Sequence, residues 1–276
     1  MVFFNISENE VDAVIKKSLI LVLSRPYIQI KRMKKIFLSY LVSCLSTSVL
    51  QAQPSPDVIG QVTIQPVMHA SLALSAGGTT LFVDPVGHSD TFNAMAAPDL
   101  ILITDIHGDH FSPETLQSLH LEHATLVVPQ VVADKLPADL KSKAVVLHNG
   151  DEKTVKGVSI TAIPMYNLPE SPDSYHTKGR GNGYVLSLGG KRIYISGDTE
   201  GTPEMKALKD IDIAFVCMNL PYTMDVKQAA EAVLAFKPSV IYPYHYRGQD
   251  TQVFKSLVEA KDSAIDVRLR NWYPGQ

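Results

Sequence analysis

Residues 100–110 read LILITDIHGDH, and this stretch decides the fold. Its first five residues, Leu100 to Thr104, have the apolar and β-branched composition of a buried strand. Two aspartates and two histidines follow at once: Asp105, His107, Asp109 and His110. Imidazole nitrogens and carboxylate oxygens are the usual ligands of Zn²⁺ and of neighbouring first-row metals, and Gly108 allows a tight turn among them. We therefore expect a metal-binding loop at the end of this strand, since a plain polar turn would not require such a density of ligands.

Two later segments have the same organisation, in which a strand-like run ends at a potential ligand. Residues 193–196 (IYIS) lead through Gly197 to Asp198, and residues 241–244 (IYPY) lead to His245. Taken alone, Asp198 fits a turn or a helix cap, and His245 fits a buried, hydrogen-bonded histidine. Loops at one edge of a sheet sandwich can bring such distant residues together, so we expect a shared site.

The order of the elements predicts the architecture. Short β-type runs at 61–66, 71–75 and 79–83 come first, and strands then alternate with helices up to residue 147. The second half repeats this order between residues 159 and 269. Two halves of this kind predict an α/β fold, an αββα four-layer sandwich in which two mixed β-sheets lie face to face with helices outside.

Charge restricts the class of partner. The chain has 276 residues, and the part that follows residue 52 carries 18 basic and 25 acidic residues, a net charge near −7. A net negative body is poorly suited to binding polyanions, so we expect no nucleic-acid partner. A small-molecule substrate fits this charge better. The sequence does not indicate which oligomeric state the protein adopts.

The N-terminal region has the features of a targeting segment. Lys34 and Lys35 precede an apolar run at residues 36–50, which predicts a signal peptide at about 33–52 behind an upstream extension, and export to the bacterial periplasm. The expected organisation is therefore residues 1–52 for extension and signal, and residues 53–276 for a single domain. The alternatives are a lipoprotein anchored through Cys44, which would give a stable membrane association, and a membrane anchor that begins near Leu19.

Together these motifs resemble the metallo-β-lactamase superfamily, in particular the branch that contains L-ascorbate-6-phosphate lactonase and the N-acyl phosphatidylethanolamine phospholipases. The resemblance covers about residues 60–270 and includes residues 83–85 (VDP) and His69, which related enzymes place near the metal pocket. A buried core histidine is the alternative for His69. The family motif is His-x-His-x-Asp-His, and this chain departs from it because Asp105 stands at the first position.

The resemblance implies one or two divalent metal ions in two ligand sets. The second set is complete and comprises Asp109, His110 and His245, with Asp198 shared between the sets. The first set has Asp105 and His107, and the family's middle histidine has no clean equivalent in the chain. Asn167 is the candidate by order, with a turn residue as its alternative, and His176 is a rival ligand or a substrate contact. Zinc is the metal expected, with manganese or iron as alternatives because the first set is rich in oxygen.

The chemistry implied is hydrolysis of an ester, lactone, amide or phosphodiester by metal-activated water, whose pKa falls to about 7. Asp109 is expected to act catalytically by orienting that water. His176, Tyr222 and Arg247 are expected to contact substrate, and Arg247 suits an anionic group. Two alternatives stay open: a metal-binding sensor or non-catalytic binding protein on the same fold, and a di-iron redox protein.

Overall fold

The computed structural model describes residues 55–87 and 89–274, and all structural statements concern these residues. The predicted extension, signal peptide and lipidation at Cys44 lie outside them. In the part of the chain that is described, no helix has the length and apolar character needed to cross a membrane.

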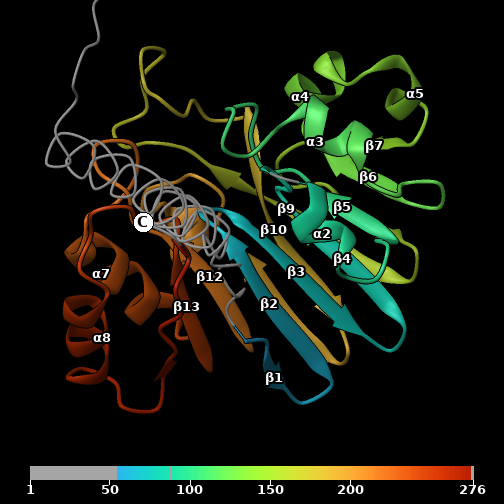
Figure 1. Cartoon of the computed structure of the whole chain (residues 1–276). Coiled ribbons are helices and arrows are strands. Elements are labelled where there is room, and N and C mark those ends of the chain that lie inside the picture. Colours follow the sequence, from blue (N-terminus) through green and yellow to red (C-terminus); the bar gives the residue numbers. More distant parts are fainter. Residues whose placement is uncertain (1–54, 88, 275–276) are drawn as a thin grey trace, which may run out of the picture. The chain divides into compact units, whose positions relative to one another are not determined.

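The first half of the described chain forms a mixed seven-stranded sheet whose strands lie side by side in sequence order (Figure 1). Its strands are β1 (Asp57–Ile59), β2 (Val62–Met68), β3 (Ser71–Ala76), β4 (Thr79–Val83), β5 (Leu100–Leu102), β6 (Thr125–Val128) and β7 (Ala144–Val146). The first four strands pair antiparallel, and β4 to β7 pair parallel.

The second half forms another mixed seven-stranded sheet, with the order β14-β13-β12-β11-β10-β9-β8. Its strands are β8 (Glu152–Val155), β9 (Val158–Met165), β10 (Gly181–Leu188), β11 (Lys191–Ile195), β12 (Ile213–Cys217), β13 (Val240–Tyr244) and β14 (Asp266–Val267). Antiparallel pairing from β8 to β11 gives way to parallel pairing from β11 to β14, so the two sheets repeat one plan.

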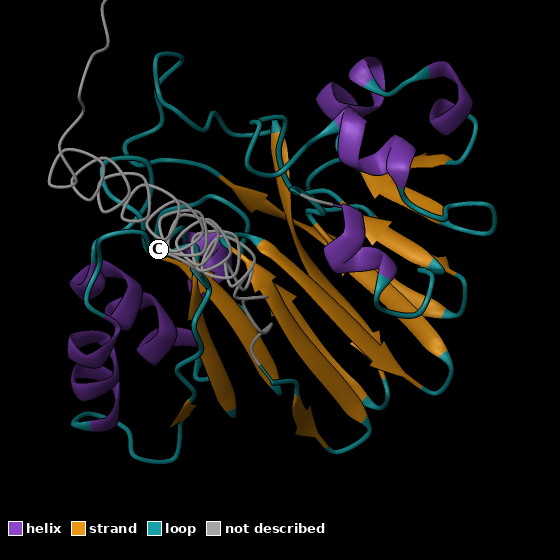
Figure 2. Cartoon of the chain, in the orientation of Figure 1, coloured by secondary structure: helices purple, strands orange, loops and turns teal. Residues whose placement is uncertain are grey.

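Helices cover the outer faces of both sheets, as Figure 2 shows in purple. The helices are α2 (Ser89–Asn93), α3 (Pro113–Ser118), α4 (Gln130–Lys135), α5 (Ala138–Lys141), α6 (Pro203–Lys206), α7 (Val226–Phe236) and α8 (Thr251–Glu259). Helix α7 is amphipathic, and the side chain of Asp225 caps its N-terminus by accepting from the backbone N–H of Gln228.

Alternation along the strands divides the core into layers. In β5, Leu100 and Leu102 pack into the core shared by the two sheets, whereas Ile101 packs into a separate cluster with helices α2 to α5. This is the period-2 pattern of a strand buried on both faces, in which successive side chains point to opposite sides. The sequence-based expectation of two mixed sheets face to face with helices outside is therefore confirmed.

Parallel pairing decides where the polar residues gather. Because neighbouring parallel strands end at the same edge of a sheet, the residues that follow β4, β5, β11 and β13 project from corresponding edges of the two sheets. These residues are Asp84, Asp105, Asp198 and His245. Each sheet thus contributes polar side chains at its strand ends, where both sheets border the same space.

Candidate metal centre

A buried aspartate, Asp198, lies at the centre of the polar cluster. Its Oδ1 is 3.3 Å from Nε2 of His110 and 3.4 Å from Nε2 of His245, and its Oδ2 is 3.2 Å from Nε2 of His176. The two carboxylate oxygens therefore face two different groups of donors. A carboxylate in this position can bridge two metal sites, as expected for Asp198.

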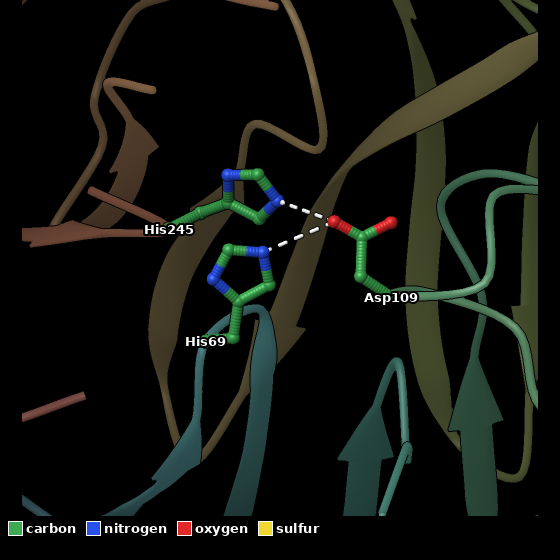
Figure 3. Close-up of side chains that lie close together, drawn as sticks. All are labelled: His69, Asp109 and His245. Atoms are coloured by element: carbon green, nitrogen blue, oxygen red, sulfur yellow. Dashed lines mark hydrogen bonds and ion pairs between the residues drawn. The ribbon is translucent and has the colours of Figure 1, made fainter. Parts of the chain in front are cut away.

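The second ligand set forms around Asp198 Oδ1. Asp109 and His245 approach from opposite sheets, with Asp109 Oδ2 at 3.3 Å from Nε2 of His245 (Figure 3). His110 contributes a third side chain through Nε2, 3.9 Å from Asp109 Oδ1. Three side chains of this set, His110, Asp198 and His245, place ligand atoms close enough to share one ion. Asp109 lies beside them through its contacts to His110 and His245, and its ligand atoms group with those of His69 and His245.

The first ligand set forms around Asp198 Oδ2. Asp105 Oδ2 is 3.0 Å from Nδ1 of His107 and 3.7 Å from Nε2 of His176. These three side chains could hold a metal ion, with Asp198 as a fourth ligand. Of the two candidates for the third ligand of this set, His176 and Asn167, it is His176 that lies in this group.

Asn167 has a different position from the one expected of a ligand. Its Oδ1 accepts a 2.8 Å hydrogen bond from the backbone N–H of His176, and its Nδ2 donates to the carbonyl of Tyr222 at 2.8 Å. The backbone N–H of Asn167 also donates to the carbonyl of His176. Asn167 therefore fastens the loop that carries His176, and both ends of its amide are engaged.

Hydrogen bonds from the outer nitrogens orient two of the imidazoles. His110 donates from Nδ1 to Asp84 Oδ2 at 2.8 Å, and His176 donates from Nδ1 to the carbonyl of Tyr222 at 3.2 Å. Asp84 is itself held by Thr104, whose backbone N–H donates to it at 2.7 Å and whose hydroxyl donates at 2.6 Å. A proton fixed on Nδ1 leaves a lone pair on Nε2, and such an outer partner is typical of metal-binding histidines.

The inner atoms of the cluster fit a cation. Among the described residues, Nε2 of His110, Nε2 of His176 and Oδ1 of Asp198 are buried and form no well-aligned hydrogen bond, although ion-pair contacts of 3.2–3.3 Å join these nitrogens to the Asp198 carboxylate. Buried polar atoms are rarely left unpaired in folded proteins, because removing them from water costs free energy that only a partner recovers. A divalent metal ion would supply that partner to all three atoms.

The charges in the cluster favour the same conclusion. Burial alone would raise the pKa of Asp198, but His245 and His110 hold that pKa well below its ordinary value. Burial alone would lower the pKa of His110, but the Asp198 and Asp84 carboxylates raise it well above its ordinary value. Without metal, the carboxylates thus hold a proton on a buried imidazole, and a cation binding at Nε2 would displace it.

His69 also belongs to the cluster. Its Nε2 lies 3.0 Å from Asp109 Oδ2 (Figure 3). Its Nδ1 lies 2.7 Å from the hydroxyl of Tyr273. His69 and His245 both have left-handed backbones, with φ of 54° and 47°, and the N–H of His245 donates to the carbonyl of His69. His69 is therefore part of the pocket, and the resemblance at residue 69 was the only sequence signal for this place.

A pocket of about 630 Å³ opens over the cluster. His107, Asp109 and His176 form part of its lining, and Tyr222 and Arg247 stand among the other lining residues. Of the residues predicted to contact substrate, Tyr222 and Arg247 therefore lie at the pocket, and His176 lies both at the pocket and against Asp198.

The fold and the site define a class of protein: a sandwich of two mixed sheets with a His/Asp metal centre at the strand ends, which is the arrangement of metallo-β-lactamase-fold hydrolases. The chain belongs to this superfamily, since residues 63–245 match the family described as "Beta-lactamase superfamily domain". The narrower resemblance to the lactonase and phospholipase branch stays a prediction.

Named relatives give the same picture. A UPF0173 metal-dependent hydrolase of Pyrococcus abyssi is 29% identical over 215 residues, which are 72% of this chain and 93% of the relative. A crystal structure of a protein from Parabacteroides distasonis, described there as a putative metal-dependent hydrolase, is 40% identical. It covers 79% of this chain and 98% of its own, with a TM-score of 0.70. A metallo hydrolase from Ignicoccus hospitalis shares the fold at 23% identity, with a TM-score of 0.64, and covers 78% of this chain and 96% of its own. The chain is a metal-dependent hydrolase of this superfamily.

Proposed function

We propose that the chain hydrolyses an ester, lactone, amide or phosphodiester of a small molecule at the cluster around Asp198. One observation carries the proposal: Nε2 of His110, Nε2 of His176 and Oδ1 of Asp198 are buried without well-aligned hydrogen bonds beneath an open pocket. His110, Asp198 and His245 would hold one ion, with Asp109 beside them, and Asp105, His107 and His176 a second, with Asp198 shared. When bound, divalent metal supplies a water of lowered pKa and a Lewis acid for the developing oxyanion.

The metal proposed for the second ligand set is zinc. Two imidazole nitrogens and two carboxylates, with space above them for water, make a common zinc environment. The first ligand set has two imidazoles and two carboxylates as well, but one of these carboxylates, Asp105, accepts a hydrogen bond from the guanidinium of Arg180. Manganese or iron would also suit either set, since the two sets have the same donors.

Asp109 is the proposed catalytic residue. Its side chain is 44% exposed and faces the pocket, unlike the fully buried His110 beside it. Burial would raise the pKa of Asp109, but His245 and His69 hold that pKa far below its ordinary value. Asp109 therefore stays ionised at neutral pH and can accept a hydrogen bond from the nucleophilic water, which fixes the direction of attack.

The mouth of the pocket supports a substrate with an anionic group and an apolar portion. Arg247 is exposed at the pocket and has no carboxylate partner within the described residues. Three lining residues, Tyr175, Leu220 and Tyr222, are large hydrophobic side chains that are 44–54% exposed. An exposed guanidinium suits a carboxylate or phosphate, and apolar side chains at a cleft suit an aromatic or acyl group.

Metal content tests the assignment of the site. Asp198→Ala and His245→Ala should each lower the metal retained after dialysis against chelator, whereas His148→Ala, an exposed histidine outside the cluster, should retain the wild-type amount. Plasma emission spectroscopy of the purified full chain gives the stoichiometry. Wild-type metal content in both cluster variants would overturn the proposal.

Activity tests the reaction. The protein loaded separately with Zn²⁺, Mn²⁺ and Fe²⁺ should hydrolyse a member of an ester, lactone, β-lactam or phosphodiester panel. Asp109→Asn should lower kcat strongly while metal stays bound, because the amide still offers an oxygen but orients water differently. Turnover of no panel member by metal-replete protein would count against hydrolysis and in favour of a binding role.

A further inference from the structure

Asp105 is held by an arginine from a distant loop. Its side chain is fully buried, and Arg180 donates to both oxygens, from Nε to Oδ1 at 3.1 Å and from Nη2 to Oδ2 at 2.7 Å. This is the bidentate geometry in which a guanidinium and a carboxylate pair most strongly. The same Oδ2 lies 3.0 Å from His107 and belongs to the first ligand set.

The position of Arg180 is fixed by backbone packing. The loop that precedes β10 carries both His176 and Arg180, and the N–H of Asn182 donates to the carbonyl of Thr104, immediately before Asp105. At Gly181 a Cβ atom would lie 2.7 Å from the same carbonyl, so only glycine allows the two segments to approach this closely. The arginine therefore meets Asp105 in one defined geometry.

Charge gives this pair a consequence for metal binding. An aspartate in the place of a histidine replaces a neutral ligand by an anionic one, which would strengthen attraction for any divalent cation. Arg180 supplies one positive charge directly against that carboxylate. Together, Asp105 and Arg180 have the net charge of a neutral imidazole, and part of the carboxylate's donor capacity is already used.

We propose, building on the function proposed above, that Arg180 is a positioning residue that weakens the first ligand set. Asp105 stands where the family motif has its first histidine, and Arg180 cancels its extra negative charge. The guanidinium also repels the incoming ion. The second ligand set has no fixed cation against its carboxylates, since Asp109 and Asp198 contact only histidines among the described ion pairs, and a metal ion can displace a histidine proton. The two sets should therefore load in order, with the second filled first.

The competing explanation is a purely structural ion pair that fastens the loop and leaves metal affinity unchanged. The two explanations differ in sign. Removing the positive charge tightens metal binding if the guanidinium repels the ion, whereas it leaves binding unchanged or weakens it if the arginine only holds the loop.

The two explanations can be separated by titrating the metal-stripped full-length protein with Mn²⁺. Calorimetry and the electron paramagnetic resonance signal of free Mn²⁺ monitor the titration. Wild type should bind one ion tightly and a second more weakly. Arg180→Met should tighten only the weaker event, by about tenfold or more for a charge within a few ångströms of the site. Arg180→Lys, which keeps the charge, should stay within a few-fold of wild type.

A second pair of variants tests charge compensation independently of loop packing. Asp105→His alone leaves the guanidinium without its carboxylate, so first-set affinity should fall. Asp105→His combined with Arg180→Met makes a set of three imidazoles without the opposing charge, and first-set affinity should recover. A structural role for Arg180 predicts the reverse, with the double variant no better than the single one.

The outcomes are distinguishable. Wild type that binds no metal overturns the proposed function itself. Wild type with two equal affinities, or Arg180→Met with unchanged or weaker first-set binding, overturns only the role of Arg180. Should Arg180→Met lower the unfolding temperature of the metal-free protein too far for titration, Arg180→Gln replaces it, with the same expected direction.

Discussion

Replacing Asp84 by asparagine should weaken metal binding although Asp84 touches no metal. Asp84 is fully buried, and its carboxylate accepts three hydrogen bonds, two from Thr104 and one from His110 Nδ1 at 2.8 Å. An asparagine keeps one acceptor oxygen, which can still serve the backbone N–H of Thr104. Its amide nitrogen, a donor, would then face the Nδ1–H of His110.

This conflict can be relieved by moving the histidine proton. If the proton shifts to Nε2, the amide donates to a bare Nδ1, but Nε2 then carries a hydrogen directed at Asp198 Oδ1, 3.3 Å away, and has no lone pair left for a metal ion. Loss of an outer partner of this kind typically lowers metal affinity by about 10- to 100-fold, which is about 1.4–2.7 kcal/mol. Loss of a hydrogen bond to a charged acceptor should also lower the free energy of unfolding by about 1.5–3 kcal/mol.

Competition with a fluorescent chelator measures the affinity, and urea unfolding of the metal-free protein measures the stability. Asp139→Asn, at an exposed aspartate in α5, is the matched control and should change neither quantity. Asp84→Asn with wild-type affinity in a folded protein would refute the reasoning, because the orientation of His110 would then not depend on its outer partner.

Three further variants test other parts of the structure. Gly183→Ala should lower the free energy of unfolding by about 1–3 kcal/mol in urea, because its Cβ would lie 2.8 Å from the carbonyl oxygen of Ser196; an unchanged midpoint would contradict this. Asp57→Asn should lower the free energy of unfolding by about 1 kcal/mol at pH 7 and by less at pH 2. Burial raises the pKa of Asp57, but hydrogen bonds from Tyr242 and Arg268 lower that pKa overall. The stabilisation by the ionised carboxylate is therefore present above the ordinary pKa of 3.8 and is lost as the pH falls through the lower folded value. Equal losses at both pH values would exclude this explanation. Asn167→Ala should weaken first-set Mn²⁺ binding with little effect on the second set, and calorimetry showing equal weakening of both would contradict its role in holding His176.

Much of the fold could be predicted because burial leaves a strong pattern. Residues 100–104 form a continuous buried run, and such runs are typical of parallel strands that are packed between two layers. The prediction omitted two edge strands, β1 (Asp57–Ile59) and β8 (Glu152–Val155). β1 has only three residues, and three of the four residues of β8 are exposed, so neither shows a clear apolar alternation. It also omitted α2 and α5, which are too short to show a helical period.

The candidate site could be predicted only where ligands follow a strand directly. Asp105, Asp198 and His245 have this placement, and the structure brings them together. His176 does not, because it lies in a loop and reaches the cluster through hydrogen bonds to Asn167 and Tyr222 that have no local sequence pattern. Arg180 meets Asp105 across 75 residues of chain, a contact that depends on how closely Gly181 approaches Thr104.

The ligands come from both sheets, and this has a mechanical consequence. Asp109 and His110 follow a strand of the first sheet, whereas Asp198 and His245 follow strands of the second. An ion held by all four would cross-link the two halves of the sandwich, at an edge where isolated backbone hydrogen bonds, such as that from the N–H of His245 to the carbonyl of His69, also join them. Metal binding would then lower the rate at which the two sheets separate locally. Removal of metal should increase local opening along this edge, including at residues that do not line the pocket.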